Sequence, residues 1–303
     1  MDSSTTSELV LDFFPFVRVY KDGRVQKFQE NDFVPPGVDP KTGVQSKDVV
    51  ISPETNVSAR VFLPKNTDPN QKFPLLIYIH GGAFVIESAF SSQYHNYLNS
   101  LVAEANVIAV SVDYRLAPEH LLPACYDDAW AVIQWVAFHA NGGGPEPWLN
   151  DHADFGKVFL AGDSAGSTIA HYTVVRAGVD GLGSGLKLVG LVLVHPFFKN
   201  DEPDKLLHYI CPDSSGFDDP RFNPAANLGL LSKLVCTKVL VVTAERDFLR
   251  QRGLTYYEAL KNSELGGSVE MVVTNGEEHV FHLKNPNCEN ALTLLKRVAS
   301  FMN

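Results

Sequence analysis

Hydrophobic residues along the chain fall into two alternating kinds of segment. Short runs that are almost continuously apolar are typical of buried strands, and longer stretches with apolar residues every three or four positions are typical of helices. We predict strands at 57–63, 74–79, 107–112, the run that begins at Val158, 188–194, 238–243 and 269–273. We predict helices at 93–105, 124–140, the segment after Ser164, 254–262 and 290–301. This alternation predicts a mostly parallel sheet with helices on both faces.

The N-terminal segment has a different pattern, in which aromatic residues lie close together. The turn at 21–24, of sequence K-D-G-R, separates two β-type runs within 17–28 and predicts a hairpin with an Asp-Gly turn. The preceding Phe13, Phe14 and Phe16 need a surface to cover. They either pack against the main body or close a pocket as part of a lid.

The segment 197–235 interrupts the alternation of strands and helices. It is polar, contains scattered prolines and shows no firm period. An insertion at this point of an α/β sheet lies over the carboxyl ends of the strands, where ligands bind. We therefore predict a single domain over 1–303, with a small lid formed from about 1–40 and 197–235.

Composition narrows the range of partners and locations. The net charge of −10 argues against nucleic acid or an anionic membrane surface, because both bind basic patches. No apolar run reaches the roughly 18 residues that span a bilayer, and the first residues lack the pattern of a signal peptide. We expect a cytoplasmic protein, monomeric or homodimeric, without membrane insertion, metal or cofactor. Its widely spaced, reduced cysteines are Cys125, Cys211, Cys236 and Cys288.

A glycine-flanked serine carries the strongest chemical signal. Gly162, Ser164 and Gly166 form the pattern G-x-S-x-G, preceded by an apolar run and followed by small residues that can open a helix. A strand, a sharp turn and a helix in this order make a nucleophile elbow, which exposes the serine hydroxyl. Ser164 is therefore a candidate nucleophile.

A serine hydroxyl needs a base to take its proton and an acid to orient that base. On a fold of this kind the chain order is Ser, then Asp or Glu, then His. Asp247 follows the predicted strand at 238–243, and His279 follows the next strand, so both lie where strands end. Glu245 and His282 are nearby alternatives, which we rank below Asp247 and His279.

The sequence H-G-G-A-F at 80–84 directly follows the predicted strand at 74–79. It resembles the H-G-G-G type of loop whose backbone N–H groups stabilise an oxyanion. Either Gly81 and Gly82 or Gly82 and Ala83 supply these groups, since Ala83 stands where the third glycine would be. The N–H group of Ala165, directly after the candidate nucleophile, completes the predicted set.

The stretch 111–128 is dense in charge and proline. Asp113, Arg115 and Glu119 could take part in chemistry, but we predict that they support the neighbouring loops through ion pairs and turns.

Taken together, the motifs at 80–84, 113–119, 162–166 and 278–281 resemble those of the plant carboxylesterases in the hormone-sensitive-lipase group of α/β-hydrolases. The resemblance extends from about Phe16 to Phe301, and the stretches 19–23 and 39–44 are similar to the plant branch in particular. It implies an α/β-hydrolase fold with about eight strands, a lid, and Ser164, Asp247 and His279 as a catalytic triad.

The resemblance also bears on the reaction. Relatives that dehydrate 2-hydroxyisoflavanones resemble this chain at 87–90 but carry threonine where Ser164 stands. Gibberellin receptors carry an aliphatic residue where His279 stands. The complete triad favours a carboxylic-ester hydrolase that forms an acyl-enzyme on Ser164. A lyase, dehydratase or cyclase using the same site is the alternative, and a small-molecule receptor is a third hypothesis.

Overall fold

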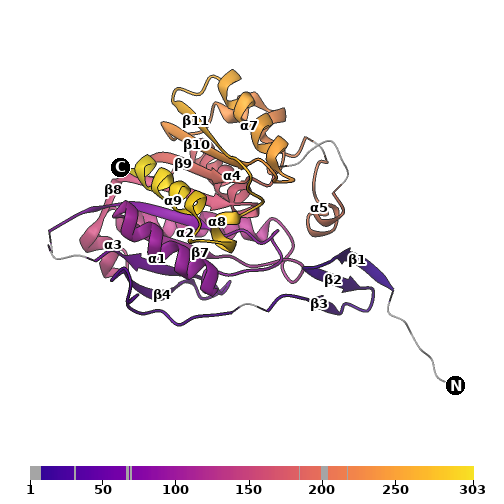
Figure 1. Ribbon diagram of the computed structural model, residues 1–303, viewed down its shortest axis with the longest axis horizontal. Coiled ribbons are helices and arrows are strands. Elements are labelled where there is room, and N and C mark those ends of the chain that lie inside the picture. Colours follow the sequence, from indigo (N-terminus) through magenta and orange to yellow (C-terminus); the bar gives the residue numbers. More distant parts are fainter. Residues whose placement is uncertain are drawn as a thin grey trace.

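The predicted apolar runs become the strands of one eight-stranded sheet (Figure 1). The structure is a computed structural model, and it describes residues 8–30, 32–65, 68, 70–183, 185–198, 204–216 and 218–303. In chain order the strands are β4 (Gln45–Ser52), β5 (Val57–Leu63), β6 (Phe73–Ile79), β7 (Ile108–Asp113), β8 (Ala153–Asp163), β9 (Leu188–Val194), β10 (Lys238–Ala244) and β11 (Ser268–Thr274).

The sheet is mostly parallel, as predicted. Its order is β11-β10-β9-β8-β6-β7-β5-β4, and only the pairs β4–β5 and β5–β7 are antiparallel. Consequently β6, β8, β9, β10 and β11 all end at the same edge, and their following loops meet there. The seven predicted strands are confirmed. The edge strand β4 was not predicted, because its first half, 45–48, is polar and none of its apolar residues is fully buried.

Helices cover both faces of the sheet. On one face lie α1 (Ser92–Ala105), α8 (Phe281–Lys284) and α9 (Glu289–Met302). On the other lie α2 (Ala124–His139), α4 (Ala165–Asp180) and α7 (Arg250–Asn262), and the short α3 (Pro147–His152) precedes β8. Successive strand residues point to opposite faces. Thus Ile77 of β6 packs in the cluster that contains α2 and α4, whereas Tyr78 packs in the cluster that contains α1 and α9.

The N-terminal arm is a separate antiparallel sheet of β1 (Leu9–Phe13), β2 (Val17–Tyr20) and β3 (Val25–Lys27). The predicted hairpin is confirmed, and Gly23 has a φ of +86°, which the turn requires and glycine allows. Figure 1 shows the arm beside helix α5 (Lys205–Ile210). Leu11, Val17 and Val19 are buried against the main body, so the arm is packed onto it.

The segment 197–235 is more regular than its sequence indicated. It contains α5, the 3-10 turn η1 (Pro224–Ala226) and α6 (Leu228–Leu231). Two of these helices begin at side-chain caps, because Asp204 accepts from the N–H of Leu207 and Asn227 accepts from the N–H of Leu230. Helices this short carry too few residues to show a period. The parts of the predicted lid at 1–7, 31, 199–203 and 217 lie outside the described residues.

All four cysteines are free, as predicted. Among the helices of the described residues, none combines the length and the apolar character needed to cross a membrane.

Candidate active site

Ser164 occupies a strained turn between β8 and α4. Its φ is +51° and its ψ is −121°, a conformation that residues other than glycine rarely adopt. Gly162 and Gly166 allow the turn to close, because a Cβ atom on either would collide with neighbouring backbone. The N–H group of Ser164 donates to the carbonyl of Val194 over 2.9 Å. The predicted elbow is therefore present.

The structure brings the three predicted side chains into one hydrogen-bonded chain. Nε2 of His279 lies 3.0 Å from Oγ of Ser164, and Nδ1 of His279 lies 2.9 Å from Oδ2 of Asp247. The other carboxylate oxygen of Asp247 accepts from the N–H of Leu249 over 2.8 Å. Asp247 is fully buried, whereas the side chain of His279 is 16% exposed and faces a cavity. This is the order in which a nucleophile, a base and an orienting acid have to stand.

The two alternatives lie elsewhere. Glu245 is exposed, and its carboxylate accepts from the N–H of Gly276 over 2.6 Å. His282 is buried against the ring of Tyr97, and burial lowers its pKa to about 3. Neither side chain hydrogen bonds to Ser164 or His279 in the described structure.

The loop after β6 presents backbone donors to the same cavity. Gly82, Ala83 and Phe84 have φ values of +100°, +53° and +66°. Successive N–H groups in such a turn form a concave anion site. Within the described hydrogen bonds, no acceptor takes the N–H of Gly82 or Ala83, and both residues line the cavity beside Ser164. Ala165 is the first residue of α4, where N–H groups have no partner inside the helix.

The prediction of Gly81 as a donor is corrected. Its N–H donates over 2.8 Å to the hydroxyl of Tyr94, which in turn donates to Oδ2 of Asp163 over 2.9 Å. Its carbonyl accepts from Tyr114 over 3.0 Å. Gly81 is therefore held on both sides of its backbone, and the geometry selects Gly82 and Ala83 from the two pairs that the sequence left open.

Sequence reasoning missed the role of Asp163 beside the nucleophile. This fully buried carboxyl accepts from the hydroxyls of Tyr78 and Tyr94, both at 2.9 Å. Burial raises its pKa to about 6, although the two hydrogen bonds oppose the shift. Its place inside G-D-S-A-G was a signal, but nothing in the sequence joins it to two distant tyrosines.

The charged stretch at 111–128 supports loops, as predicted. Arg115 makes a bidentate ion pair with the buried Asp128, with contacts of 2.6 and 2.9 Å. Asp113 accepts from the hydroxyl of Ser88 over 2.5 Å, and Glu119 pairs with Lys27 of the arm.

A cavity of about 650 Å³ opens above Ser164. Its apolar wall comes from the arm, the loop after β6 and the loops after β9 and β10: Phe13, Phe16, Ile86, Phe197 and Phe248. Its polar lining includes Gln29, Glu87, Gln93, Asp204, Arg252 and Lys284. Both segments predicted to form a lid thus contribute residues to the wall.

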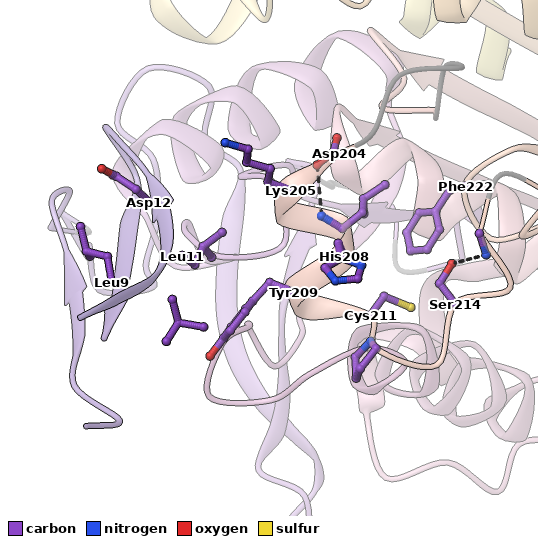
Figure 2. Close-up of a pocket in the computed structure, with 14 residues that line it drawn as sticks. Leu9, Leu11, Asp12, Asp204, Lys205, His208, Tyr209, Cys211, Ser214 and Phe222 are labelled. Carbon is purple, nitrogen blue, oxygen red and sulfur yellow. Dashed lines mark hydrogen bonds between the residues drawn. The ribbon is translucent and has the colours of Figure 1, made fainter. Parts of the chain in front are cut away.

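Figure 2 shows a second cavity, of about 990 Å³, between β1 and α5. Leu9 and Leu11 of the arm lie on one side, and Tyr209 and Phe222 lie on the other. None of the triad residues lines it, although Asp204 borders both cavities. Ser164 and His279 therefore face the smaller cavity.

Three side chains at the site have a spacing that a metal ion could use. Ligand atoms of His195, Asp247 and His279 lie within 4.8 Å of one another. However, Nδ1 of His195 accepts from the N–H of Val280, and Nδ1 of His279 faces Asp247. These nitrogens already serve contacts within the protein, so we assign no metal here.

Comparison with known proteins agrees with this geometry. Residues 76–283 match the family model described as an alpha/beta hydrolase fold. The chain is 46% identical to probable carboxylesterase 5 of Arabidopsis thaliana, covering 98% of this chain and 99% of that protein. It is 42% identical to a 2-hydroxyisoflavanone dehydratase of Glycyrrhiza echinata, with coverage of 99% and 98%.

Among solved structures, an esterase of Pyrobaculum calidifontis is similar, with a TM-score of 0.69 and 29% identity. The match covers 85% of this chain and 84% of that one. The elbow, the strand order and these relatives agree: the chain belongs to the α/β-hydrolase family, in the branch that holds plant carboxylesterases and 2-hydroxyisoflavanone dehydratases.

Proposed function

We propose that the protein is a serine carboxylesterase that hydrolyses esters of small molecules. The observation that carries this proposal is the contact chain from Ser164 through His279 to Asp247, at 3.0 and 2.9 Å. The N–H groups of Gly82 and Ala83, which have no acceptor among the described hydrogen bonds, border the same cavity and can stabilise the oxyanion of acyl transfer.

The first half of the reaction forms an acyl-enzyme. Oγ of Ser164 attacks the ester carbonyl carbon while Nε2 of His279 takes the hydroxyl proton. The buried carboxylate of Asp247 stabilises the resulting imidazolium and holds its orientation. The carbonyl oxygen becomes an oxyanion that accepts from the N–H groups of Gly82, Ala83 and Ala165. Each such donor lowers the barrier by roughly 2.7–4 kcal/mol.

The tetrahedral intermediate collapses when the bond to the alcohol oxygen breaks. His279 returns its proton to that oxygen, so the alcohol leaves neutral and the acyl group stays on Ser164. In the second half, a water molecule attacks the acyl carbon as His279 accepts its proton. The bond to Oγ then breaks, the proton returns to Ser164, and the carboxylic acid leaves.

The cavity bears on the choice of substrate. About 650 Å³ is an ordinary volume for a small-molecule site, and its aromatic wall suits acyl groups of short or medium length. We propose that the arm and the segment 197–235 act as the lid, since Phe13 and Phe16 of the arm and Phe197 of that segment line the cavity.

The test is hydrolysis of p-nitrophenyl esters from acetate to decanoate by the wild type and by Ser164→Ala. We expect Ser164→Ala to lose on the order of 10⁴-fold or more in kcat, because the nucleophile is removed. The chain-length profile of the wild type then measures the acyl pocket. Wild-type rates in Ser164→Ala would refute the proposal.

The similarity to a 2-hydroxyisoflavanone dehydratase favours one alternative, a lyase that uses the same site. In that reaction His279 would abstract a proton from carbon, the N–H groups would stabilise an enolate, and Ser164 would form no covalent bond. Turnover of a 2-hydroxyisoflavanone that survives Ser164→Ala would favour this reading over ester hydrolysis.

A further inference from the structure

His195 is a buried histidine beside the triad that the reaction above does not use. It follows the last residue of β9, has a φ of +50° and is 1% exposed. Its backbone N–H donates to the carbonyl of Val242 over 2.8 Å. A residue other than glycine persists in this conformation only where its surroundings impose it.

One hydrogen bond joins His195 to the loop that carries the base. The N–H of Val280, the residue directly after His279, donates to Nδ1 of His195 over 2.9 Å. Val280 has a φ of +49°, which is a clear outlier for a β-branched residue. Two strained residues from different loops thus hold each other in place.

The donor in this bond fixes the state of the imidazole. A backbone N–H can only donate, so Nδ1 of His195 must be unprotonated and its single proton sits on Nε2. In the described structure Nε2 is buried without a partner. Burial also lowers the pKa of His195 well below its usual value, in keeping with a neutral ring. Oδ2 of Asp247 lies 3.9 Å from Nδ1 of His195. Because the His195 ring is neutral, it does not compete with His279 for an ion pair with this carboxylate.

The same segment contacts the nucleophile. The carbonyl of Val194 accepts the N–H of Ser164 over 2.9 Å, and the N–H of Phe197 donates to the carbonyl of Ser164 over 3.1 Å. The segment 194–197 therefore binds the elbow through its backbone and the base loop through the His195 side chain.

We propose that His195 is a positioning residue, which sets the distance between His279 and Ser164 by accepting the Val280 N–H at Nδ1. The proposal rests on the acyl-transfer function proposed above. Its central requirement is an acceptor at the place of Nδ1, and the rest of the ring is dispensable.

Side chains with an acceptor at different distances from Cβ test this requirement. Asparagine carries its oxygen on Cγ, as histidine carries Nδ1, whereas the oxygen of glutamine lies one bond further out. Leucine fills a similar volume without an acceptor. We expect kcat to fall roughly 10- to 100-fold in His195→Leu, with KM within about two-fold, because small misplacements of a base are costly.

The conservative variant should restore the rate. We expect the kcat of His195→Asn to stay within about three-fold of the wild-type value and to be higher than the kcat of His195→Gln. His282→Leu is the matched control, since it replaces another buried histidine near His279 that makes no hydrogen bond in the described structure. It should keep wild-type kcat and KM. Thermal unfolding of each variant checks its folding.

Two results would overturn the proposal: a wild-type kcat in folded His195→Leu, or a His195→Gln rate equal to or above that of His195→Asn. If His195→Leu does not fold, the comparison of asparagine with glutamine decides. Failure of the proposed function looks different, because the wild type itself would then be inactive on esters. In that case the rate at which a fluorophosphonate labels Ser164 provides the same comparison among variants.

Discussion

At the scale of single residues, the backbone of Gly81 shows how the loop after β6 is held in place. Tyr94 accepts its N–H, and Tyr114 donates to its carbonyl. The ring of Tyr114 also stacks on His80 with centroids 4.2 Å apart. Gly81 is thus fixed, whereas Gly82 and Ala83 line the cavity and their N–H groups have no acceptor among the described hydrogen bonds.

Removal of one hydroxyl tests this arrangement. In Tyr94→Phe we expect kcat to fall about 10-fold with little change in KM, because misplaced oxyanion donors lose part of their effect in the transition state. Tyr97→Phe is the control, since Tyr97 lies on the same helix, is also buried and makes no hydrogen bond to Gly81. Steady-state kinetics on p-nitrophenyl acetate measures both. Equal kcat values for the two variants would contradict the role of Tyr94.

Some residues of the site could be predicted from the sequence, and others could not. Ser164, Asp247 and His279 were predictable because a short motif and the ends of two strands locate them. The sequence also ranked Asp247 above Glu245, but the hydrogen bond that occupies the N–H of Gly81 became visible only in the structure. A backbone N–H points one way or the other according to φ and ψ, which the letters G-G-A do not determine.

At the scale of elements, the arm makes one wall of the active-site cavity. The rings of Phe13 and Phe16 lie 5.3 Å apart, and both line the cavity. Phe14 belongs to the same turn but is 65% exposed and packs its edge against Phe28. The sequence left open whether these aromatic residues cover the core or a pocket. In the structure Phe13 and Phe16 pack against the core and also line the cavity, whereas Phe14 is exposed.

Truncation of Phe16, which lines the cavity, and truncation of the exposed Phe14 should have different effects on KM. In Phe16→Ala we expect KM for p-nitrophenyl hexanoate to rise several-fold with kcat nearly unchanged, because apolar contact with the acyl chain is lost in ground and transition states alike. Phe14→Ala should leave both constants unchanged. A similar rise in KM for both variants would show that the arm acts through its general packing and not through this wall.

The elements that could not be predicted from the sequence are those that lack a long run or period of apolar residues. Strand β4 lies at the edge of the sheet and begins with the polar stretch 45–48, and Asp48 at the end of that stretch pairs with the buried Arg60 of β5. Helix α5 has only six residues. Pairing across strands and capping of a single turn depend on neighbours in space, so a one-dimensional pattern does not reveal them.

At the scale of the whole molecule, five buried histidines make the fold sensitive to acid. Burial lowers the pKa of His80 to about 4, and those of His171 and His282 to about 3; burial also lowers the pKa values of His139 and His195. Below the usual value of 6.5 the unfolded chain binds protons at these sites and the folded protein does not. Stability therefore falls as the pH drops from about 6.5 towards these lowered values.

A substitution of His282 measures how much one buried histidine contributes to this pH dependence of stability. Between pH 7 and pH 5 its neutral burial costs about 2 kcal/mol of unfolding free energy, from about 1.4 kcal/mol per pH unit below 6.5. We expect the wild type to lose about that much more stability over this range than His282→Leu, as measured by urea unfolding at both pH values. The same pH dependence in both proteins would mean that His282 takes up a proton in the folded state.

The overall fold was the most predictable level. Seven near-continuous apolar runs separated by helices leave few arrangements other than a mostly parallel, doubly covered sheet. The carboxyl ends of those strands bring the candidate triad to one edge, and so sequence order alone indicated a common site. The cavity shape was not predictable, since it depends on how the arm and α5 pack.

The measurement that tests the central claim most directly is covalent labelling by a fluorophosphonate, followed by mass spectrometry of the peptide that contains residue 164. We expect one adduct, on Ser164, with ester hydrolysis lost in proportion to labelling and no adduct in Ser164→Ala. Ester hydrolysis that continues while Ser164 is fully labelled, or that persists in folded Ser164→Ala, would contradict the account.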